Sequence, residues 1–328
     1  MWRWLFRLLL LCLLIAGYVS YQLVRYPDIS PERLLSHYTD GQVQQRLISG
    51  QPLYYQDQGK GQAIVLLHSH FFSMQMWDPI ADELARYYRV IRFDLTSHGL
   101  TGPALDNDYS LDRDIELLRG LIEALAPGPV VLVGSSLGGN IAIGYSARYP
   151  EQVKALVLQN SGGFRKADSR GGRGEDLPAW ADYLLYMLPR AAYNRFLQWM
   201  IVDDSLITPQ LQWQFHDNFR RQGNRKAEMQ RIRQFKEGGA ATQLQQLTLP
   251  VLIQWGEANP QLPVAMTELF VEALVQAASV QVITYPNTGH VLPLERPAES
   301  LADLRHFLQQ LPGSRLEPAE QEPANDTL

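Results

Sequence analysis

The chain has 328 residues, of which 46% are hydrophobic and 19% are charged. This length suffices for one large α/β domain with an inserted subdomain, and the composition excludes broad disorder. The formal net charge of -5 gives no reason to expect nucleic-acid binding. The single cysteine, Cys12, excludes a disulfide framework and a cysteine-based metal site.

The N-terminus has the pattern of a membrane anchor. Arg3 and Arg7 precede an apolar run from Leu8 to Val24, which would span about 25 Å as a helix. No small-residue cleavage site follows, so residues 1–26 are expected to form an uncleaved single-pass anchor. A cleaved signal peptide and a helix lying on the membrane surface are the alternatives. The two arginines favour the cytoplasm, which would place the rest of the chain on the extracytoplasmic side.

Two stretches of the chain alternate between short apolar runs and helical patterns. A linker is expected over residues 27–41, and the alternation covers 42–162 and 249–311. Apolar runs without a polar face, each followed by a helix, are typical of a mostly parallel β-sheet covered by helices on both sides, an α/β fold. After an opening hairpin over 42–56, the expected strands are 63–67, 90–93, 130–133, 155–158, 251–255 and 280–285.

Residues 163–248 interrupt this alternation. They contain no good strand pattern but three helical stretches rich in aromatic residues, around 179–201, 208–222 and 224–237. The simplest interpretation is a helical lid inserted into the α/β domain. The Pro/Glu/Ala-rich tail, residues 312–328, is expected to be disordered.

A glycine-flanked serine carries the strongest chemical signal. The apolar run Val130–Val133 leads into Gly134-Ser135-Ser136-Leu137-Gly138, and a helix is expected from Leu137 onward. In a strand–turn–helix context the G-x-S-x-G pattern exposes the central serine at the tip of the strand. The N-terminus of the following helix directs backbone N–H groups at a developing oxyanion. Ser136 is therefore the predicted nucleophile.

A serine nucleophile needs a base, and the chain has seven histidines. His290 follows the last expected strand, at the same sheet edge as Ser136, and it is the last group in the order serine, acid, histidine. We therefore predict that His290 is the general base.

These motifs resemble the α/β-hydrolase superfamily, most of all its lid-bearing serine hydrolases: esterases, lipases and C–C bond hydrolases. The resemblance implies that the backbone N–H groups of Leu137 and His70 form the oxyanion hole. It places Ser69 where the family usually has a glycine. It covers about residues 45–310 and rests on Leu66-Leu67-His68, Met76-Trp77-Asp78, Arg92-Phe93-Asp94-Leu95, Ser97-His98-Gly99, the serine motif, Trp255-Gly256-Glu257 and Gly289-His290.

The acid of the triad departs from the family pattern. The position three residues after Gly256 holds Asn259, and the alternative position, at Asn160, has no carboxylate either. An asparagine can accept the Nδ1–H of His290 but cannot stabilise the imidazolium by charge. Three interpretations stay open: Asn259 orients His290 in a slower enzyme, Glu257 reaches His290 instead, or hydrolysis is lost and the pocket is kept.

The sequence thus favours a membrane-anchored serine hydrolase that cleaves an ester or related acyl bond. The aromatic lid favours an apolar small-molecule or lipid-like substrate. The sequence has no phosphate-binding loop, dinucleotide fingerprint or metal-ligand motif, so no cofactor is expected. The competing hypothesis is a catalytically impaired binding protein with a lidded apolar pocket.

Overall fold

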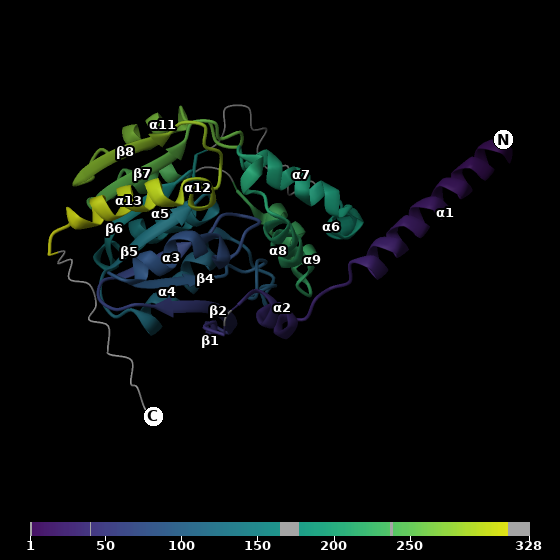
Figure 1. Cartoon of the computed structure of the whole chain (residues 1–328), viewed down its shortest axis with the longest axis horizontal. Helices are drawn as coiled ribbons and strands as arrows, with labels where there is room; N and C mark the ends of the chain where they lie inside the picture. The colour runs from purple at the N-terminus through teal and green to yellow at the C-terminus, as the bar shows by residue number, and fades with distance from the viewer. Residues whose placement is uncertain (1, 40, 165–176, 237–238, 314–328) are drawn as a thin grey trace, which may run out of the picture.

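An eight-stranded sheet forms the centre of the molecule, with the strand order β1-β2-β4-β3-β5-β6-β7-β8 (Figure 1). The computed structural model describes residues 2–39, 41–164, 177–236 and 239–313. Residues 314–328, most of the tail expected to be disordered, lie outside the described residues. The strands are β1 Gln44–Ile48, β2 Gln51–Gln58, β3 Ala63–Leu67, β4 Arg89–Phe93, β5 Val130–Ser135, β6 Val153–Gln159, β7 Pro250–Gly256 and β8 Ser279–Tyr285.

The sheet is mostly parallel, which confirms the fold predicted from the sequence. Only β2 pairs antiparallel, with β1 in the opening hairpin and with β4 on its other side. The five remaining pairings are parallel. The carboxyl ends of β3 to β8 therefore meet at one edge, where binding sites of such sheets lie.

Helices cover both faces of the sheet because the central strands are apolar on both faces. In β3, Val65 and Leu67 pack against the helices on one face, and Ile64 and Leu66 pack against those on the other. The side chain of Ser110 caps the N-terminus of α4 by accepting the N–H of Arg113. The first face carries α4 Leu111–Leu125, α5 Leu137–Arg148 and α11 Met266–Ala273; the second carries α3 Asp78–Ala85, α12 Leu292–Glu295 and α13 Pro297–Gln309, with the short 3₁₀ helix η1 Met74–Trp77 before α3.

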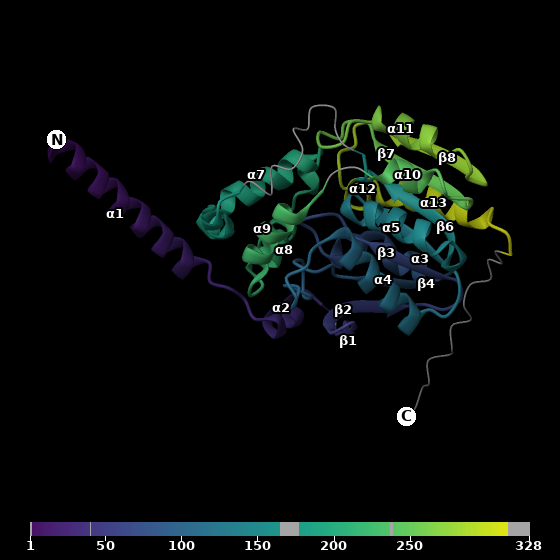
Figure 2. The same cartoon turned by 180° about the vertical axis from the view of Figure 1, so that it is seen from behind.

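The described part of residues 163–248 contains helices and no strand. The first helical stretch, expected to run from 179 to 201, is broken at Leu188, whose backbone is extended, because Pro189 follows it. Helices α6 to α9 lie together beyond one end of the sheet (Figures 1 and 2), whereas α10 packs on α5 and α11. The elements are η3 Ala179–Tyr183, α6 Leu184–Met187, α7 Arg190–Met200, η4 Asp204–Leu206, α8 Pro209–Arg220, α9 Asn224–Gln234 and α10 Ala240–Leu244.

The N-terminal helix α1, Trp2–Arg25, projects away from the rest of the molecule (Figure 1). Among the described residues it is the one helix long and apolar enough to cross a membrane. The segment that follows it, expected as a linker, contains α2 Pro31–Tyr38 and packs against the molecule. Ile29 exchanges backbone hydrogen bonds with Arg220 and Gln222 at the end of α8. The chain is therefore fixed to the helical insertion, the described part of residues 163–248, shortly after α1 ends at Arg25.

Candidate active site

Ser136 stands in the turn between β5 and α5 with a strained backbone. Its φ of 52° and ψ of -112° lie in a region that non-glycine residues rarely adopt, at a cost of about 1–3 kcal/mol. The turn is held by two backbone hydrogen bonds: the Ser136 N–H donates to Gln159 O at 3.1 Å, and Ser136 O accepts the N–H of Gly162 at 2.9 Å. The structure thus has the strand–turn–helix geometry of a nucleophile elbow.

Two glycines make this tight turn possible. A Cβ atom on Gly134 would lie 2.4 Å from the carbonyl oxygen of Gly138, and one on Gly138 would lie 2.3 Å from that of Leu67. Both obstacles are backbone atoms of the sheet or of α5, which cannot rotate away. The pattern G-x-S-x-G is therefore a packing requirement of the β5–α5 junction as well as a chemical motif.

His290 lies in the loop after β8 and is buried, with 2% of its surface exposed. Its loop is fixed by Glu295, whose carboxylate accepts the N–H of Gly289 at 2.8 Å and that of Val291 at 3.0 Å. Burial raises the pKa of Glu295, and these hydrogen bonds oppose that rise. The His290 N–H also donates to Met200 O at the end of α7, at 2.8 Å. Hydrogen bonds to Glu295 and to Met200 therefore fix the backbone around the predicted base.

Asn259 is the side chain behind the predicted base. Its Oδ1 atom lies 3.2 Å from Nδ1 of His290 and also accepts the N–H groups of Gln261 and Leu262, each at 3.0 Å. Because two backbone donors point at one atom of the amide, that atom must be the oxygen. The Nδ2 group of Asn259 is buried and has no hydrogen-bond partner among the described residues.

The structure does not bring Glu257 to His290. Glu257 is exposed, and its Oε1 accepts the hydroxyl hydrogen of Thr284 on β8 at 2.8 Å. Of the two acid positions considered from the sequence, the structure joins Asn259 and not Glu257 to the histidine.

Asn160 instead connects the loops around the site, a role that the sequence did not reveal. Its Nδ2 donates to the carbonyl oxygens of Gly289 and His290 at 3.2 and 2.9 Å, and its Oδ1 accepts the N–H of Gly256 at 2.9 Å. The preceding residue, Gln159, accepts the N–H of Ser136. Two consecutive residues at the end of β6 therefore hold the serine turn and the histidine loop.

The predicted oxyanion donors are both available. The N–H groups of Leu137 and His70 donate no hydrogen bond to any residue that the structure describes. Leu137 begins α5, and His70 lies in the loop after β3. The next residue in that loop, Phe71, has a φ of 70°, and its N–H donates to Nε2 of His98 at 3.0 Å.

A buried polar cluster beside this loop was also not predicted from the sequence. On α9, Glu228 contacts the ring of His70, and Arg231 pairs with Asp114 of α4 at 2.7 Å. All of these groups except His70 are buried. Nothing in the sequence pattern distinguishes these charged residues from ordinary surface residues of a helix.

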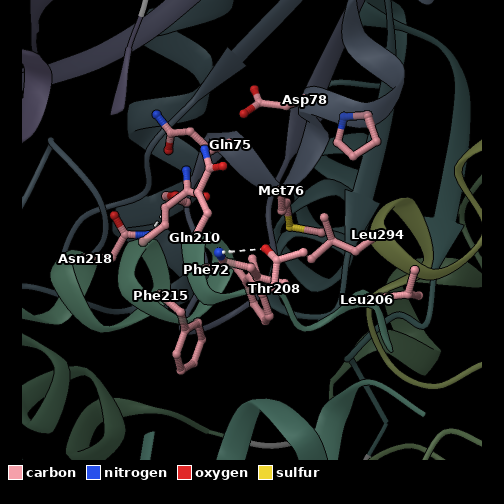
Figure 3. A pocket seen from close by; sticks show the side chains of 14 residues that line it. Phe72, Gln75, Met76, Asp78, Leu206, Thr208, Gln210, Phe215, Asn218 and Leu294 are labelled. Carbon is pink, nitrogen blue, oxygen red and sulfur yellow. Dashed lines mark hydrogen bonds between the residues drawn. The ribbon is translucent and has the colours of Figure 1, made fainter. Parts of the chain in front are cut away.

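A separate cavity of about 280 Å³ lies between η1, α8 and α12 (Figure 3). It is apolar at Phe72, Phe215 and Leu294 and carries amide groups such as Gln75 and Asn218 at its edge. Asn218 donates to the Ser73 hydroxyl oxygen at 2.9 Å across it. Its lining includes neither Ser136 nor His290, so it is distinct from the candidate catalytic centre.

Residues 64–304 match the alpha/beta hydrolase family, and the chain belongs to that family. It is 26% identical to Lipase 3 of Moraxella sp. (strain TA144) over 80% of this chain and 82% of that protein. It is 24% identical to monoacylglycerol lipase ABHD6 of Homo sapiens over 76% of each chain. The crystal structure of a membrane phospholipase A, a bacterial virulence factor, superposes with a TM-score of 0.70 at 21% identity and covers 96% of this chain and all of that one. This last similarity shows the shared fold.

The glycine at 138 gives a first testable prediction. Gly138→Ala should destabilise the β5–α5 junction by more than about 2 kcal/mol, because its Cβ would meet the backbone of Leu67. Thermal unfolding of the full chain in detergent would measure this. Gly144→Ala on the same helix is the control, because its Cβ meets side-chain atoms of Ile115 and Gln243 and no backbone atom, and the close one, Cδ1 of Ile115 at 2.6 Å, is the end of a side chain that can move. Equal melting temperatures for the two variants would contradict the packing argument.

Proposed function

We propose that this protein is a membrane-anchored serine hydrolase that cleaves an ester or related acyl bond of an apolar substrate. One arrangement carries the proposal: a strained Ser136 at a nucleophile elbow, a His290 whose Nδ1 is oriented by Asn259, and the N–H groups of Leu137 and His70, which donate to no described residue. Membership of the alpha/beta hydrolase family and the similarity to two lipases support hydrolysis of esters.

In the proposed reaction the Ser136 hydroxyl attacks the substrate carbonyl carbon and His290 takes the hydroxyl proton. The N–H groups of Leu137 and His70 stabilise the oxyanion of the tetrahedral intermediate. Collapse of that intermediate expels the alcohol, which receives the proton from His290 and leaves an acyl group on Ser136. A water molecule, deprotonated by His290, then attacks the acyl-enzyme and releases the carboxylic acid.

Asn259 limits the rate of this reaction. Its Oδ1 accepts the Nδ1–H of His290, which directs the lone pair of Nε2 toward the serine. A neutral amide does not stabilise the imidazolium that forms as the serine loses its proton. In a serine protease, the change from aspartate to asparagine at this position lowers kcat about 10⁴-fold. We therefore propose a slow enzyme, with His290 correctly oriented and weakly activated.

An apolar substrate and a membrane location fit the remaining features. We assign the helical lid to residues 163–248; its helices α7 and α8 place Phe196, Phe215 and Phe219 next to Phe71 and Phe72 of the loop after β3. An exposed apolar helix, α1, is suited to anchor the chain in a bilayer. Arg3 and Arg7 before that helix favour an extracytoplasmic catalytic domain.

The competing proposal is a binding protein that keeps the lidded pocket without turnover. The missing carboxylate behind His290 is the observation that favours it. In that protein the elbow and the loops around it would be retained as scaffold, and Ser136 would not react.

A fluorophosphonate probe separates the two proposals. The full chain in detergent or membranes should become covalently labelled at Ser136, and Ser136→Ala should not be labelled. Ser135→Ala is the matched control, since it removes the neighbouring hydroxyl, which bonds Ser69 at 2.7 Å, and leaves the elbow serine. Well-folded wild-type protein that resists the probe would leave only the binding-protein proposal.

Restoring the charge behind His290 should accelerate the enzyme. We expect Asn259→Asp to raise kcat/KM for a p-nitrophenyl butyrate substrate at least tenfold, because the new carboxylate stabilises the imidazolium and removes a buried N–H group that has no partner among the described residues. Asn287→Asp, at an exposed position in the same loop as His290, is the control for the added charge. An unchanged rate in Asn259→Asp together with lost activity in Glu257→Gln would assign the role to Glu257.

The proposed orientation predicts the location of the C-terminus. In a bacterial host, a C-terminal alkaline phosphatase fusion of the full chain should be active, and a C-terminal green fluorescent protein fusion should be dark, because the C-terminus follows an extracytoplasmic domain. The opposite pair of readings would place the catalytic domain in the cytoplasm.

A further inference from the structure

The loop that carries the proposed oxyanion donor His70 needs external support. Phe71, the next residue, has a φ of 70°, a conformation that suits glycine far better than a phenylalanine. A loop that contains such a residue keeps its shape only where its surroundings fix it. The position of the His70 N–H therefore depends on what holds this loop.

Two side-chain contacts hold the loop, one on each of two consecutive residues. His98, from the turn after β4, accepts the Phe71 N–H at its Nε2 and donates its Nδ1–H to Thr96 O at 2.9 Å. Burial keeps the pKa of His98 well below its ordinary value, so this ring is neutral. Glu228, from α9, contacts Nε2 of the His70 ring and accepts a hydrogen bond from it.

Glu228 is a buried anion, with 1% of its surface exposed. Burial alone would raise its pKa, but the side chains around it, first of all the His70 ring, outweigh burial and lower the pKa to about 2. Its second oxygen accepts the hydroxyl hydrogen of Ser97 at 3.0 Å. A buried carboxylate is unfavourable unless hydrogen-bond donors compensate its lost hydration, so the hydrogen bond from the His70 ring is strongly favoured.

The helix that carries Glu228 is itself fixed to the α/β domain. Arg231, one turn further along α9, pairs with Asp114 and donates to both oxygens of Thr96. At the start of α9, Asn224 donates to Gly99 O at 3.1 Å. Contacts on both sides of Glu228 thus hold its carboxylate at a fixed distance from the loop after β3.

A metal ion is the other chemistry that these side chains suggest, because the ligand atoms of His70, His98 and Glu228 lie within 4.8 Å of one another. The hydrogen bonds argue against it. The Nε2 lone pair of His98 already accepts the Phe71 N–H, and the second Glu228 oxygen already accepts the Ser97 hydroxyl. A metal would have to break the contact that holds Phe71 in place.

We propose that Glu228 is a positioning residue of the reaction: it clamps the His70 side chain so that the His70 backbone N–H stays directed at the oxyanion. The helical insertion thus completes the oxyanion hole from a distance, without touching the substrate. This inference rests on the proposed function for the role of the His70 N–H, whereas the clamp on the loop does not depend on it.

The first test measures the loop itself in the full chain in detergent. In Glu228→Gln, hydrogen exchange of peptides covering residues 68–73 should be at least tenfold faster than in wild type, because the amide replaces the charge that holds His70. Glu268→Gln, at an exposed position on α11, is the matched control and should leave this exchange unchanged. Unchanged exchange in Glu228→Gln would overturn the clamp whether or not the protein is an enzyme.

The second test measures catalysis, with active protein counted by the endpoint of fluorophosphonate labelling. Glu228→Gln should lower kcat for p-nitrophenyl butyrate roughly 10- to 100-fold and leave KM within about twofold, below the 10²–10³ measured when an oxyanion donor is deleted outright. The inhibition constant of a trifluoromethyl ketone should rise by the same factor. Glu268→Gln, the exposed control on α11, should leave kcat, KM and this inhibition constant unchanged.

The outcomes separate the clamp from the proposed function. Faster exchange in Glu228→Gln combined with a wild-type protein that hydrolyses no ester would support the clamp and reject the enzyme. An active wild type with unchanged kcat in Glu228→Gln would overturn the positioning role. Stoichiometric zinc in purified wild-type protein, lost in Glu228→Gln, would also overturn it in favour of a metal site.

Discussion

The strained turn at Ser136 is the constraint on which the rest of the site depends. The turn requires that β5 and α5 approach each other so closely that Gly134 and Gly138 have no room for a side chain. β5 lies between β3 and β6 in the sheet, so the two neighbouring strands end beside the turn. β3 leads into the His70 loop, and β6 ends at Gln159 and Asn160, which bond the serine turn and the histidine loop. The junction is thus linked to the His70 loop through β3 and to the His290 loop through Asn160.

Around that junction, the residues that would orient His290 as a base are present, but the position behind the histidine holds an amide where a triad has a carboxylate. Glu295 and Asn160 fix the backbone around His290, and two N–H groups direct the oxygen of Asn259 toward its ring. The cost appears on the other side of the same amide, where the buried Nδ2 finds no partner among the described residues, which is unfavourable by about 1–3 kcal/mol. The donors around Asn259 thus reward its oxygen, and no described acceptor rewards the N–H groups that distinguish this amide from a carboxylate.

The sequence predicted the parts of this molecule that follow from local patterns. The strand expected over 63–67 is β3 with those bounds, and the elbow follows from the glycines around Ser136. Patterns failed where a single residue overrides periodicity, as Pro189 does when it divides the expected helix over 179–201. They also failed where direction matters, because spacing alone could not tell that the side chain of Glu257 turns toward Thr284.

Contacts between residues far apart in the chain could not be predicted from the sequence, for a different reason. His70 and Glu228 are 158 residues apart, and a glutamate on a polar helix is ordinarily a surface residue. Its burial results from the way α9 packs on the turn after β4, which no periodicity in either segment encodes. The resemblance to α/β-hydrolases could assign a role to the backbone of His70, but not a partner to its side chain.

The same packing divides the helical insertion into a fixed part and a less fixed part. Arg231 is 1% exposed and pairs with Asp114, and Arg225 pairs with Asp28 of the segment after α1 at 2.5 Å. Removing one partner of the buried Arg231–Asp114 pair would leave an uncompensated charge and cost about 3–5 kcal/mol, so this pair holds α9 on the α/β domain. The more exposed Arg225–Asp28 pair is a weaker link between α9 and the segment after α1. By contrast, α6 has no buried residue. If the insertion opens to admit a substrate, we therefore expect α6 to move rather than α9, because the buried Arg231–Asp114 pair holds α9 on the α/β domain.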